Sequence, residues 1–193
     1  MKYINEFFED FKDKYIFSAN DVKRFLSYRK ANNDYYKIFL YNLTNEDKIH
    51  KIRYGYYSFN DNIMLTGFSY KPFYYGLESA LSLLNLWEQE TNPVIITPLH
   101  IRTGIMQYEG RNYIVRRISR EMFFGYQYIK YFNFYMPVSD LEKTLMDLVY
   151  YNEKIPDYLF NNIRKKANKK ILKIYISEIK TSSIRNKLSK LLL

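Results

Sequence analysis

The chain has 193 residues, of which 47% are hydrophobic and 26% charged, and its formal net charge is +10. This composition excludes general disorder, and the absence of cysteine excludes disulfides, thiolate metal sites and cysteine nucleophiles. No apolar run approaches the ~20 residues that a bilayer-spanning helix needs, and the acidic start of the chain is not typical of a signal peptide. We therefore expect a soluble cytoplasmic protein without membrane contact, and the charge favours an anionic partner.

Three short helices are predicted in the first part of the chain. Apolar side chains at helical spacing predict the first helix over residues 2–14. A capping box formed by Ser18 and Asp21 is predicted to start the second helix. The third helix is predicted over Asn33–Asn45, with a buried stripe of Tyr36, Phe39, Leu40 and Leu43.

A β-hairpin is predicted over Lys48–Phe59, turning near Arg53-Tyr54-Gly55, because β-branched and aromatic residues flank a glycine there. Three short helices followed by a hairpin is the element order of a winged helix-turn-helix, whose third helix enters the major groove of DNA. A small helical subdomain with a hairpin and no ligand has the same composition. The pattern alone therefore leaves both interpretations open.

The stretch Lys23–Arg53 holds eight basic and three acidic residues, which favours DNA as its partner. Asn33 stands at the end of the third helix that meets base edges and is suited to adenine, but it is equally suited to cap its own helix. Lys37 can meet guanine or phosphate, and Lys51 and Arg53 can meet phosphate or the minor groove. The predicted DNA-binding residues are Lys30, Asn32, Asn33, Lys37, Tyr41, Lys51, Arg53 and Tyr54.

Residues 61–71 are predicted to form a linker with an irregular loop. It joins the winged helix-turn-helix domain, residues 1–60, to a second domain, residues 72–193, which ends in a basic helical tail from residue 154. This arrangement predicts an α+β chain: a winged helix-turn-helix, then an α/β domain with antiparallel strands and a C-terminal helical bundle.

The second domain is predicted to mix strands and helices. A helix is predicted from Leu77, with Leu77, Ala80, Leu81 and Leu84 buried. Strands are predicted at residues 93–97, 101–118 (a hairpin turning at Glu109-Gly110-Arg111), 122–129 and 132–138. A second capping box, Ser139 to Glu142, is predicted to open a helix with an apolar face of Leu141, Leu145, Leu148 and Val149. From Asp157 onward only helices are predicted.

No catalytic or metal-binding pattern stands out in the sequence. His50 and His100 are fifty residues apart, whereas a metal site needs several ligands at suitable spacing. The glycines are scattered singly, so neither a P-loop nor a dinucleotide motif is present. Glu142 and Asp147 would lie about 140° apart around one helix and would not converge. We expect no enzyme activity, no cofactor and no metal.

Two stretches of the second domain carry a family resemblance. They are Tyr-x-x-Leu-Glu-Ser-Ala-Leu at Tyr74–Leu81 and Val-Ser-x-x-Glu-Lys-Thr-x-x-Asp at Val138–Asp147, with Ile52–Tyr57 as a weaker third match. With these motifs in this order, the chain resembles the AbiEi antitoxin family of type IV toxin–antitoxin systems up to about residue 165.

This resemblance implies a function. Proteins of the family repress their own operon by binding inverted repeats through an N-terminal winged helix, and their C-terminal domain neutralises a toxin of the nucleotidyltransferase class. The toxin's signature of Gly-Ser with paired aspartates is absent here, so the resemblance implies an antitoxin. An inverted repeat would bind two copies of the chain, for which a homodimer is one arrangement.

Two alternatives remain open. One is a stand-alone winged-helix regulator without a toxin partner. The other is a protein whose basic C-terminal helices bind RNA or another acidic surface. Residues 154–193 hold 11 basic and 2 acidic side chains, so most of the excess positive charge lies there rather than in the predicted DNA-binding domain.

Overall fold

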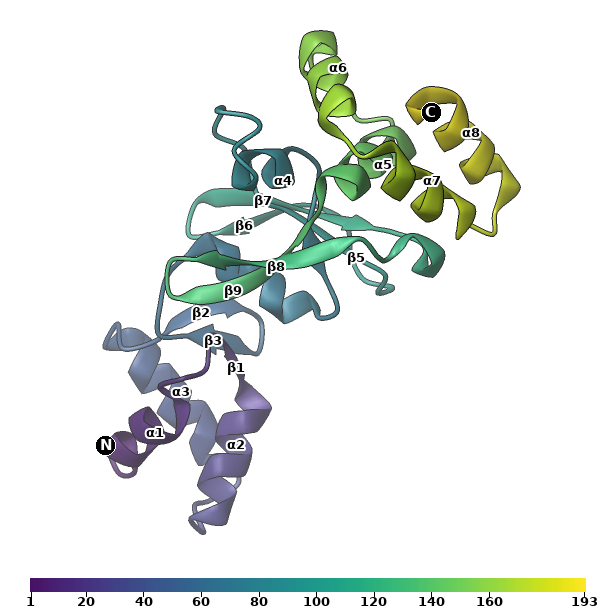
Figure 1. The fold of residues 1–193 in the computed structure, drawn as a ribbon. Coiled ribbons are helices and arrows are strands. Elements are labelled where there is room, and N and C mark those ends of the chain that lie inside the picture. Colours follow the sequence, from purple (N-terminus) through teal and green to yellow (C-terminus); the bar gives the residue numbers. More distant parts are fainter. The chain divides into compact units, whose positions relative to one another are not determined.

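The computed structural model describes all 193 residues, and the chain divides into two compact units, Met1–Ser69 and Tyr70–Leu193. Each unit combines helices with one sheet and has its own hydrophobic core, so the fold is mixed α+β as predicted (Figure 1). The longest α-helices have 11 residues, and none of the helices has the length and apolar character needed to span a membrane.

The N-terminal unit contains three α-helices and three short strands. In chain order they are α1 (Ile4–Phe11), β1 (Phe17–Ser18), α2 (Ala19–Tyr28), α3 (Tyr35–Asn45), β2 (His50–Arg53) and β3 (Tyr56–Ser58). The strands form an antiparallel sheet in the order β1-β3-β2. The predicted hairpin is confirmed, and Gly55 in its turn has the positive φ of 76° that favours glycine.

Aromatic rings fill the core of this unit. The side chain of Phe7 is fully buried, and its ring lies between 4.7 and 5.9 Å from the ring centroids of Phe11, Phe17, Phe25 and Phe39. Edge-to-face arrangements dominate these pairs, as expected from the quadrupole of aromatic rings. The predicted buried stripe of α3 is confirmed at Phe39, Leu40 and Leu43, whereas Tyr36 is only half-buried.

The predicted capping box at the start of α2 is confirmed. The Ser18 hydroxyl oxygen accepts from the backbone N–H of Asp21 at 3.1 Å, and the Asp21 carboxylate accepts from the backbone N–H of Ser18 at 2.8 Å. Partial burial acts to raise the pKa of Asp21, but the hydrogen bonds from Ser18 outweigh it and lower that pKa.

The ends of α1 and α3 differ from the prediction. Tyr3 has a left-handed backbone conformation, with φ at 68°, so α1 begins only at Ile4, and it ends at Phe11 rather than at residue 14. The side chain of Asn32 accepts from the backbone N–H of Asp34 at 3.0 Å and holds the chain in a turn before α3. Asn33 therefore does not cap α3, because Asp34 occupies the N-cap position.

A 3₁₀ helix, η1 (Ile63–Tyr70), replaces most of the predicted irregular loop. Most of its side chains are buried, including Leu65 and Phe68. The sequence shows no helical period here, so burial rather than local propensity accounts for the ordered conformation. The boundary between the two compact units falls within η1, after Ser69.

The C-terminal unit is built on a mixed sheet in the order β6-β7-β5-β4-β9-β8. The strands are β4 (Tyr74–Tyr75), β5 (Val94–Thr97), β6 (Gly104–Tyr108), β7 (Arg111–Arg117), β8 (Tyr126–Tyr131) and β9 (Phe134–Ser139). The pairs β4–β9 and β5–β7 are parallel, so the expectation of antiparallel strands holds only for the other pairs. A short 3₁₀ helix, η2 (Arg120–Met122), occupies the start of the strand predicted at residues 122–129.

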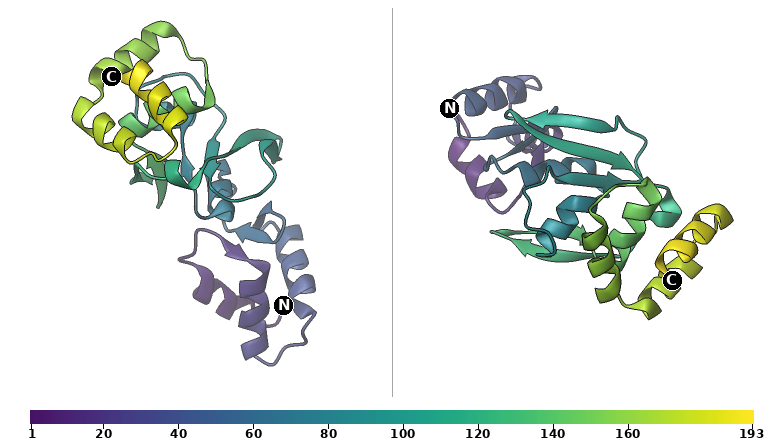
Figure 2. Two further views of the ribbon diagram at one scale, coloured as in Figure 1. Left: turned by 90° about the vertical axis from the view of Figure 1, so that its right-hand side faces the viewer. Right: turned by 90° about the horizontal axis from the view of Figure 1, so that it is seen from above.

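Five α-helices complete this unit: α4 (Leu77–Leu83), α5 (Leu141–Tyr151), α6 (Asp157–Lys166), α7 (Lys169–Ser177) and α8 (Ser182–Leu192). Helix α5 contacts α4, β9 and each of α6, α7 and α8 (Figure 2). This central position buries every residue from Glu142 to Val149, polar ones included. Leu84 and Leu141, predicted as buried, are only partly buried.

The second predicted capping box is wrong. Asp140, not Ser139, caps α5, and its carboxylate accepts from the backbone N–H of Lys143 at 2.7 Å. The carboxylate of Glu142 accepts instead from the backbone N–H of Asn168, at 2.6 Å, just before α7. Local spacing predicts that the Glu142 side chain completes the cap, but this side chain instead accepts a hydrogen bond from a residue distant in sequence.

Candidate functional site

A groove of about 690 Å³ lies between the start of α2, helix α3 and the β2–β3 hairpin of the N-terminal unit. Its lining is mostly tyrosine, lysine and small polar residues. The lining residues are Ser18, Ala19, Asn20, Tyr36, Lys37, Leu40, Tyr41, Thr44, Asn45, Lys51, Tyr54, Gly55, Tyr56 and Tyr57. No acidic side chain lines the groove, so it offers cations and hydrogen-bond donors to an anionic ligand.

Four of the eight predicted DNA-binding residues lie in this groove: Lys37, Tyr41, Lys51 and Tyr54. Tyr41 on α3 is 65% exposed and Tyr54 in the hairpin turn is 89% exposed, although both are large aromatic residues. Exposed aromatic rings at a polar groove are typical of binding surfaces rather than of cores.

The two lysines of the groove are held in different ways. The Lys37 ammonium pairs with the Asp34 carboxylate at 2.8 Å, a contact that raises the pKa of Lys37 and lowers that of Asp34. The Lys51 ammonium lies 5.7 Å from the centroid of the Tyr54 ring, within cation–π range. Both lysines are exposed, so both ammonium groups are open to an anion from solvent.

The other four predicted residues lie outside the groove lining. Lys30 and Asn33 are exposed, whereas the side chain of Asn32 is bonded to the backbone of Asp34. The Arg53 guanidinium donates to the backbone carbonyl of Ser69 at 3.2 Å, so part of its hydrogen-bonding capacity is used within the chain. The structure therefore brings half of the predicted set together.

Sequence analysis missed several groove residues, mainly the tyrosines at positions 36, 56 and 57 and Asn20. Helical spacing predicts Tyr36 in the core, whereas the structure leaves it half-buried at the groove. Alternation of side chains along a strand places the adjacent Tyr56 and Tyr57 on opposite faces, so this signal could have indicated only one of them. Asn20 lies two residues after the Ser18 cap, in the first turn of α2, where the backbone N–H of Ala19 donates to the carbonyl of Gly55 in the hairpin turn.

Arg29 illustrates a basic residue with a structural role. Its guanidinium lies 3.8 Å from the centroid of the Phe25 ring and pairs with Glu6 at 2.5 Å and Asp10 at 3.1 Å. These contacts join α2 to α1. Part of the positive charge that favours a DNA partner is therefore neutralised by carboxylates of the same unit.

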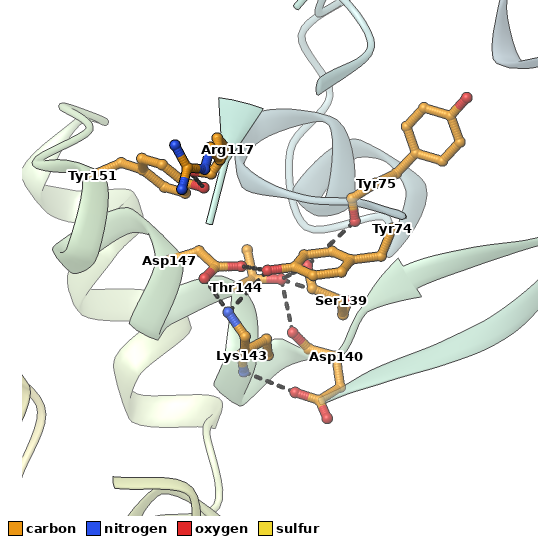
Figure 3. A network of polar contacts seen from close by, with 9 residues as sticks. All are labelled: Tyr74, Tyr75, Arg117, Ser139, Asp140, Lys143, Thr144, Asp147 and Tyr151. Carbon is orange, nitrogen blue, oxygen red and sulfur yellow. Dashed lines mark hydrogen bonds and ion pairs between the residues drawn. The ribbon is translucent and has the colours of Figure 1, made fainter. Parts of the chain in front are cut away.

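A second arrangement of polar side chains lies in the interior of the C-terminal unit (Figure 3). The Lys143 ammonium on α5 is paired with the Asp147 carboxylate one turn later and donates to the Tyr74 hydroxyl of β4 at 2.9 Å. That hydroxyl donates in turn to Asp147 at 2.8 Å. All three side chains are 0% exposed.

Hydroxyl groups extend this network along α5. The hydroxyls of Ser139 and Thr144 are 2.7 Å apart, and the Thr144 hydroxyl also donates to the backbone carbonyl of Asp140 at 2.7 Å. Tyr175 of α7 donates to the Asp140 carboxylate at 2.6 Å. The network therefore ties β4, β9, α5 and α7 together.

Burial dominates the electrostatics of the network. It lowers the pKa of Lys143 and raises that of Asp147, while the contact between the two groups opposes both shifts. Burial and the neighbouring Asp147 raise the pKa of Tyr74 well above its usual value. Because none of the three side chains has exposed surface, no substrate reaches them in this conformation.

The network residues come from the two motifs that carry the family resemblance. Tyr74 begins the first motif, and Ser139, Lys143, Thr144 and Asp147 belong to the second. The motifs therefore meet in the core of the C-terminal unit rather than on a surface. No group of three or more histidine and carboxylate side chains is arranged to hold a metal ion.

Comparisons with known proteins add no identification. No protein-family model matches the chain, and no curated protein matches it.

Proposed function

We propose that the chain is a DNA-binding transcriptional regulator of the AbiEi antitoxin type, and that its N-terminal unit is a winged helix that binds an inverted repeat in its own promoter. The observation that carries this proposal is the groove between α3 and the β2–β3 hairpin. The element order of this unit, α1-β1-α2-α3-β2-β3, is the one that a winged helix needs.

In this proposal α3 lies in the major groove and the hairpin lies against the adjacent backbone or minor groove. Lys37 and Tyr41 face the groove from α3, and Lys51 and Tyr54 face it from the hairpin. DNA phosphate competes with Asp34 for Lys37, which is feasible because the ion pair is exposed and so contributes little to stability. Asn33, exposed and not used as a cap, is the candidate for reading a base.

The antitoxin half of the proposal rests on the two motifs of the C-terminal unit. Their residues are largely buried, so a nucleotidyltransferase-type toxin would bind a different surface of this unit. The alternative is a stand-alone regulator with the same N-terminal unit and no toxin. Co-expression with the product of the adjacent gene distinguishes the two, since only an antitoxin rescues growth from a toxic neighbour.

DNA binding is tested with the full chain and the DNA upstream of its coding sequence, measured by fluorescence anisotropy. The Lys37→Ala/Lys51→Ala variant is expected to bind at least about tenfold more weakly, and its salt slope is expected to fall by about 0.9 for each lost phosphate contact. The matched control is Lys2→Ala/Lys12→Ala, which removes two exposed lysines of the same unit away from the groove. Equal losses in the two variants would refute the groove as the DNA site.

Base reading is tested separately with Asn33→Ala. We expect this variant to lose discrimination between the promoter and a scrambled duplex, by about 1–3 kcal/mol if the contact is bidentate. Binding to the scrambled duplex itself is expected to stay unchanged. A variant that discriminates as well as the original chain would remove Asn33 from the interface.

A further inference from the structure

The most concentrated charge of the molecule lies far from the groove in sequence, where α6 ends and α7 begins. Six basic residues occupy ten positions there: Arg164, Lys165, Lys166, Lys169, Lys170 and Lys173. All six are exposed. We call this set the α6–α7 basic corner.

The corner has no acidic partner within the chain. None of the basic side chains between Lys154 and Lys190 forms an ion pair. Glu142, which lies beside the corner, is 8% exposed and accepts from the backbone N–H of Asn168. The charge is therefore not balanced by intramolecular contacts.

The fold places like charges next to one another at this corner. Lys169 and Lys173 are four residues apart on α7 and Lys170 and Lys173 are three apart, spacings at which side chains are neighbours on a helix. Like charges at these spacings destabilise a helix, and solubility alone does not require such crowding. An external polyanion would relieve the repulsion.

We infer that the α6–α7 basic corner binds the phosphate backbone of double-stranded DNA without reading its sequence. Lysine predominates in the corner, and lysine binds phosphate as a point charge with little directional demand. Protein–protein interfaces are depleted in lysine, whereas five of the six residues of the corner are lysine. Charge and composition thus favour a phosphate backbone over an acidic protein.

The test uses the full chain and a scrambled duplex that contains no promoter sequence. In the corner variant, Lys165, Lys166, Lys169 and Lys170 are each replaced by Gln. The control variant replaces Lys2, Lys12, Lys14 and Lys48 by Gln, which are also exposed, lie outside the groove lining and carry the same total charge. Both variants have the same net charge, so they differ only in where the charge was removed.

We expect the corner variant to lose about 0.9 in salt slope for each phosphate contact, about 3 in total, and to bind the scrambled duplex at least about tenfold more weakly. The control variant is expected to keep the slope of the original chain to within about 1. Equal effects in both variants, or an unchanged slope in the corner variant, would overturn the inference. Circular dichroism of both variants shows whether the helices have stayed folded.

Two further measurements distinguish this inference from binding to RNA or to an acidic protein, and from the proposed function. If the corner variant loses more affinity for double-stranded RNA or for polyglutamate than for DNA, the corner serves a different partner and the inference fails. Discrimination between promoter and scrambled duplex is expected to be the same in the corner variant as in the original chain. A chain that binds both duplexes equally would refute sequence-specific regulation while leaving the backbone contact of the corner intact.

Discussion

Lys143 carries the most unusual charged group in the molecule, because its ammonium group is fully buried in the core within an ion pair. Desolvation of a charged group costs several kcal/mol, which only close contacts can offset. Here Asp147 and the Tyr74 hydroxyl supply those contacts. The pair is consequently far more costly to break than its net contribution to stability suggests.

Removal of one partner is therefore expected to be severe. Asp147→Ala leaves Lys143 without its counter-charge and is expected to lower the free energy of unfolding by about 3–5 kcal/mol. The triple variant Lys143→Met/Asp147→Leu/Tyr74→Phe removes all the polar atoms together and is expected to stay within about 2 kcal/mol of the original chain. Urea unfolding followed by the fluorescence of Trp87, the single tryptophan, reports on this unit. A triple variant as unstable as Asp147→Ala would contradict this interpretation.

A second residue-scale prediction concerns pH. The pKa of Asp21 is lower in the folded chain than in an unfolded chain, so its contribution to stability is fully present above about pH 4 and is lost as the pH falls through the folded value. Asp21→Asn is expected to destabilise α2 at pH 7. At acidic pH the stability of α2 in this variant is expected to differ little from that in the original chain. Hydrogen exchange of the α2 amides at the two pH values measures this difference. Asp13→Asn, at an exposed residue without an ion pair, is the control and should show no difference at either pH.

At the scale of elements, α2 and the two hairpins could be predicted from sequence because their signals are local. The capping box and the glycine turns involve residues within a few positions of each other. The 3₁₀ helix η1 and the surroundings of α5 could not be predicted, because both depend on tertiary burial. Nothing in the spacing of Lys143 and Asp147 shows that α6, α7 and α8 will pack around α5 and exclude water.

The candidate site was predictable to a similar extent. With Leu40 and Leu43 in the buried stripe, helical spacing leaves Tyr41 on the opposite face of α3 and Lys37 on its flank. The turn signal predicts Lys51 and Tyr54 on the hairpin. The contacts of Asn32 and Arg53 with backbone groups could not be predicted, since they depend on the local path of the chain. Arg53 in particular bonds to a carbonyl 16 residues further on.

Two glycines of the C-terminal unit allow a matched prediction about an element. Gly110 and Gly125 both have positive φ, at 74° and 68°, but a Cβ on Gly110 would meet no atom within 4 Å, whereas a Cβ on Gly125 would lie 2.9 Å from the Cβ of Lys143. Gly110→Ala is expected to cost about 1–2 kcal/mol from backbone strain. Gly125→Ala is expected to cost about 1–3 kcal/mol more, from overpacking against α5. Urea unfolding with Trp87 fluorescence compares the two, and equal losses would contradict the close approach.

At the scale of the whole molecule, the open edge of the larger sheet bears on self-association. Strand β8 is an edge strand, and exposed aromatic residues lie on it and on the adjoining turn and strand: Tyr128, Phe132 and Tyr135. Lys130 is the only charged residue within β8. A charged residue on an edge strand opposes pairing with another chain.

Replacement of this one charge is therefore expected to promote association. Lys130→Val is expected to form oligomers or aggregates at concentrations where the original chain does not, as measured by light scattering. Lys12→Val removes an exposed lysine from a helix and is the control. Identical scattering from the two variants would show that the edge is protected in another way.

The burial of the motif residues Tyr74, Lys143 and Asp147 also has a consequence for how relatives of this chain are recognised. Side chains buried in a core are required by the fold itself, whichever partner the outer surface binds. A search with these motifs would therefore gather proteins with the same internal architecture and leave their partners undetermined. Such a search ignores the residues that would contact DNA in the proposed function, such as Tyr41 and Tyr54 of the α3 groove, because these lie outside both motifs.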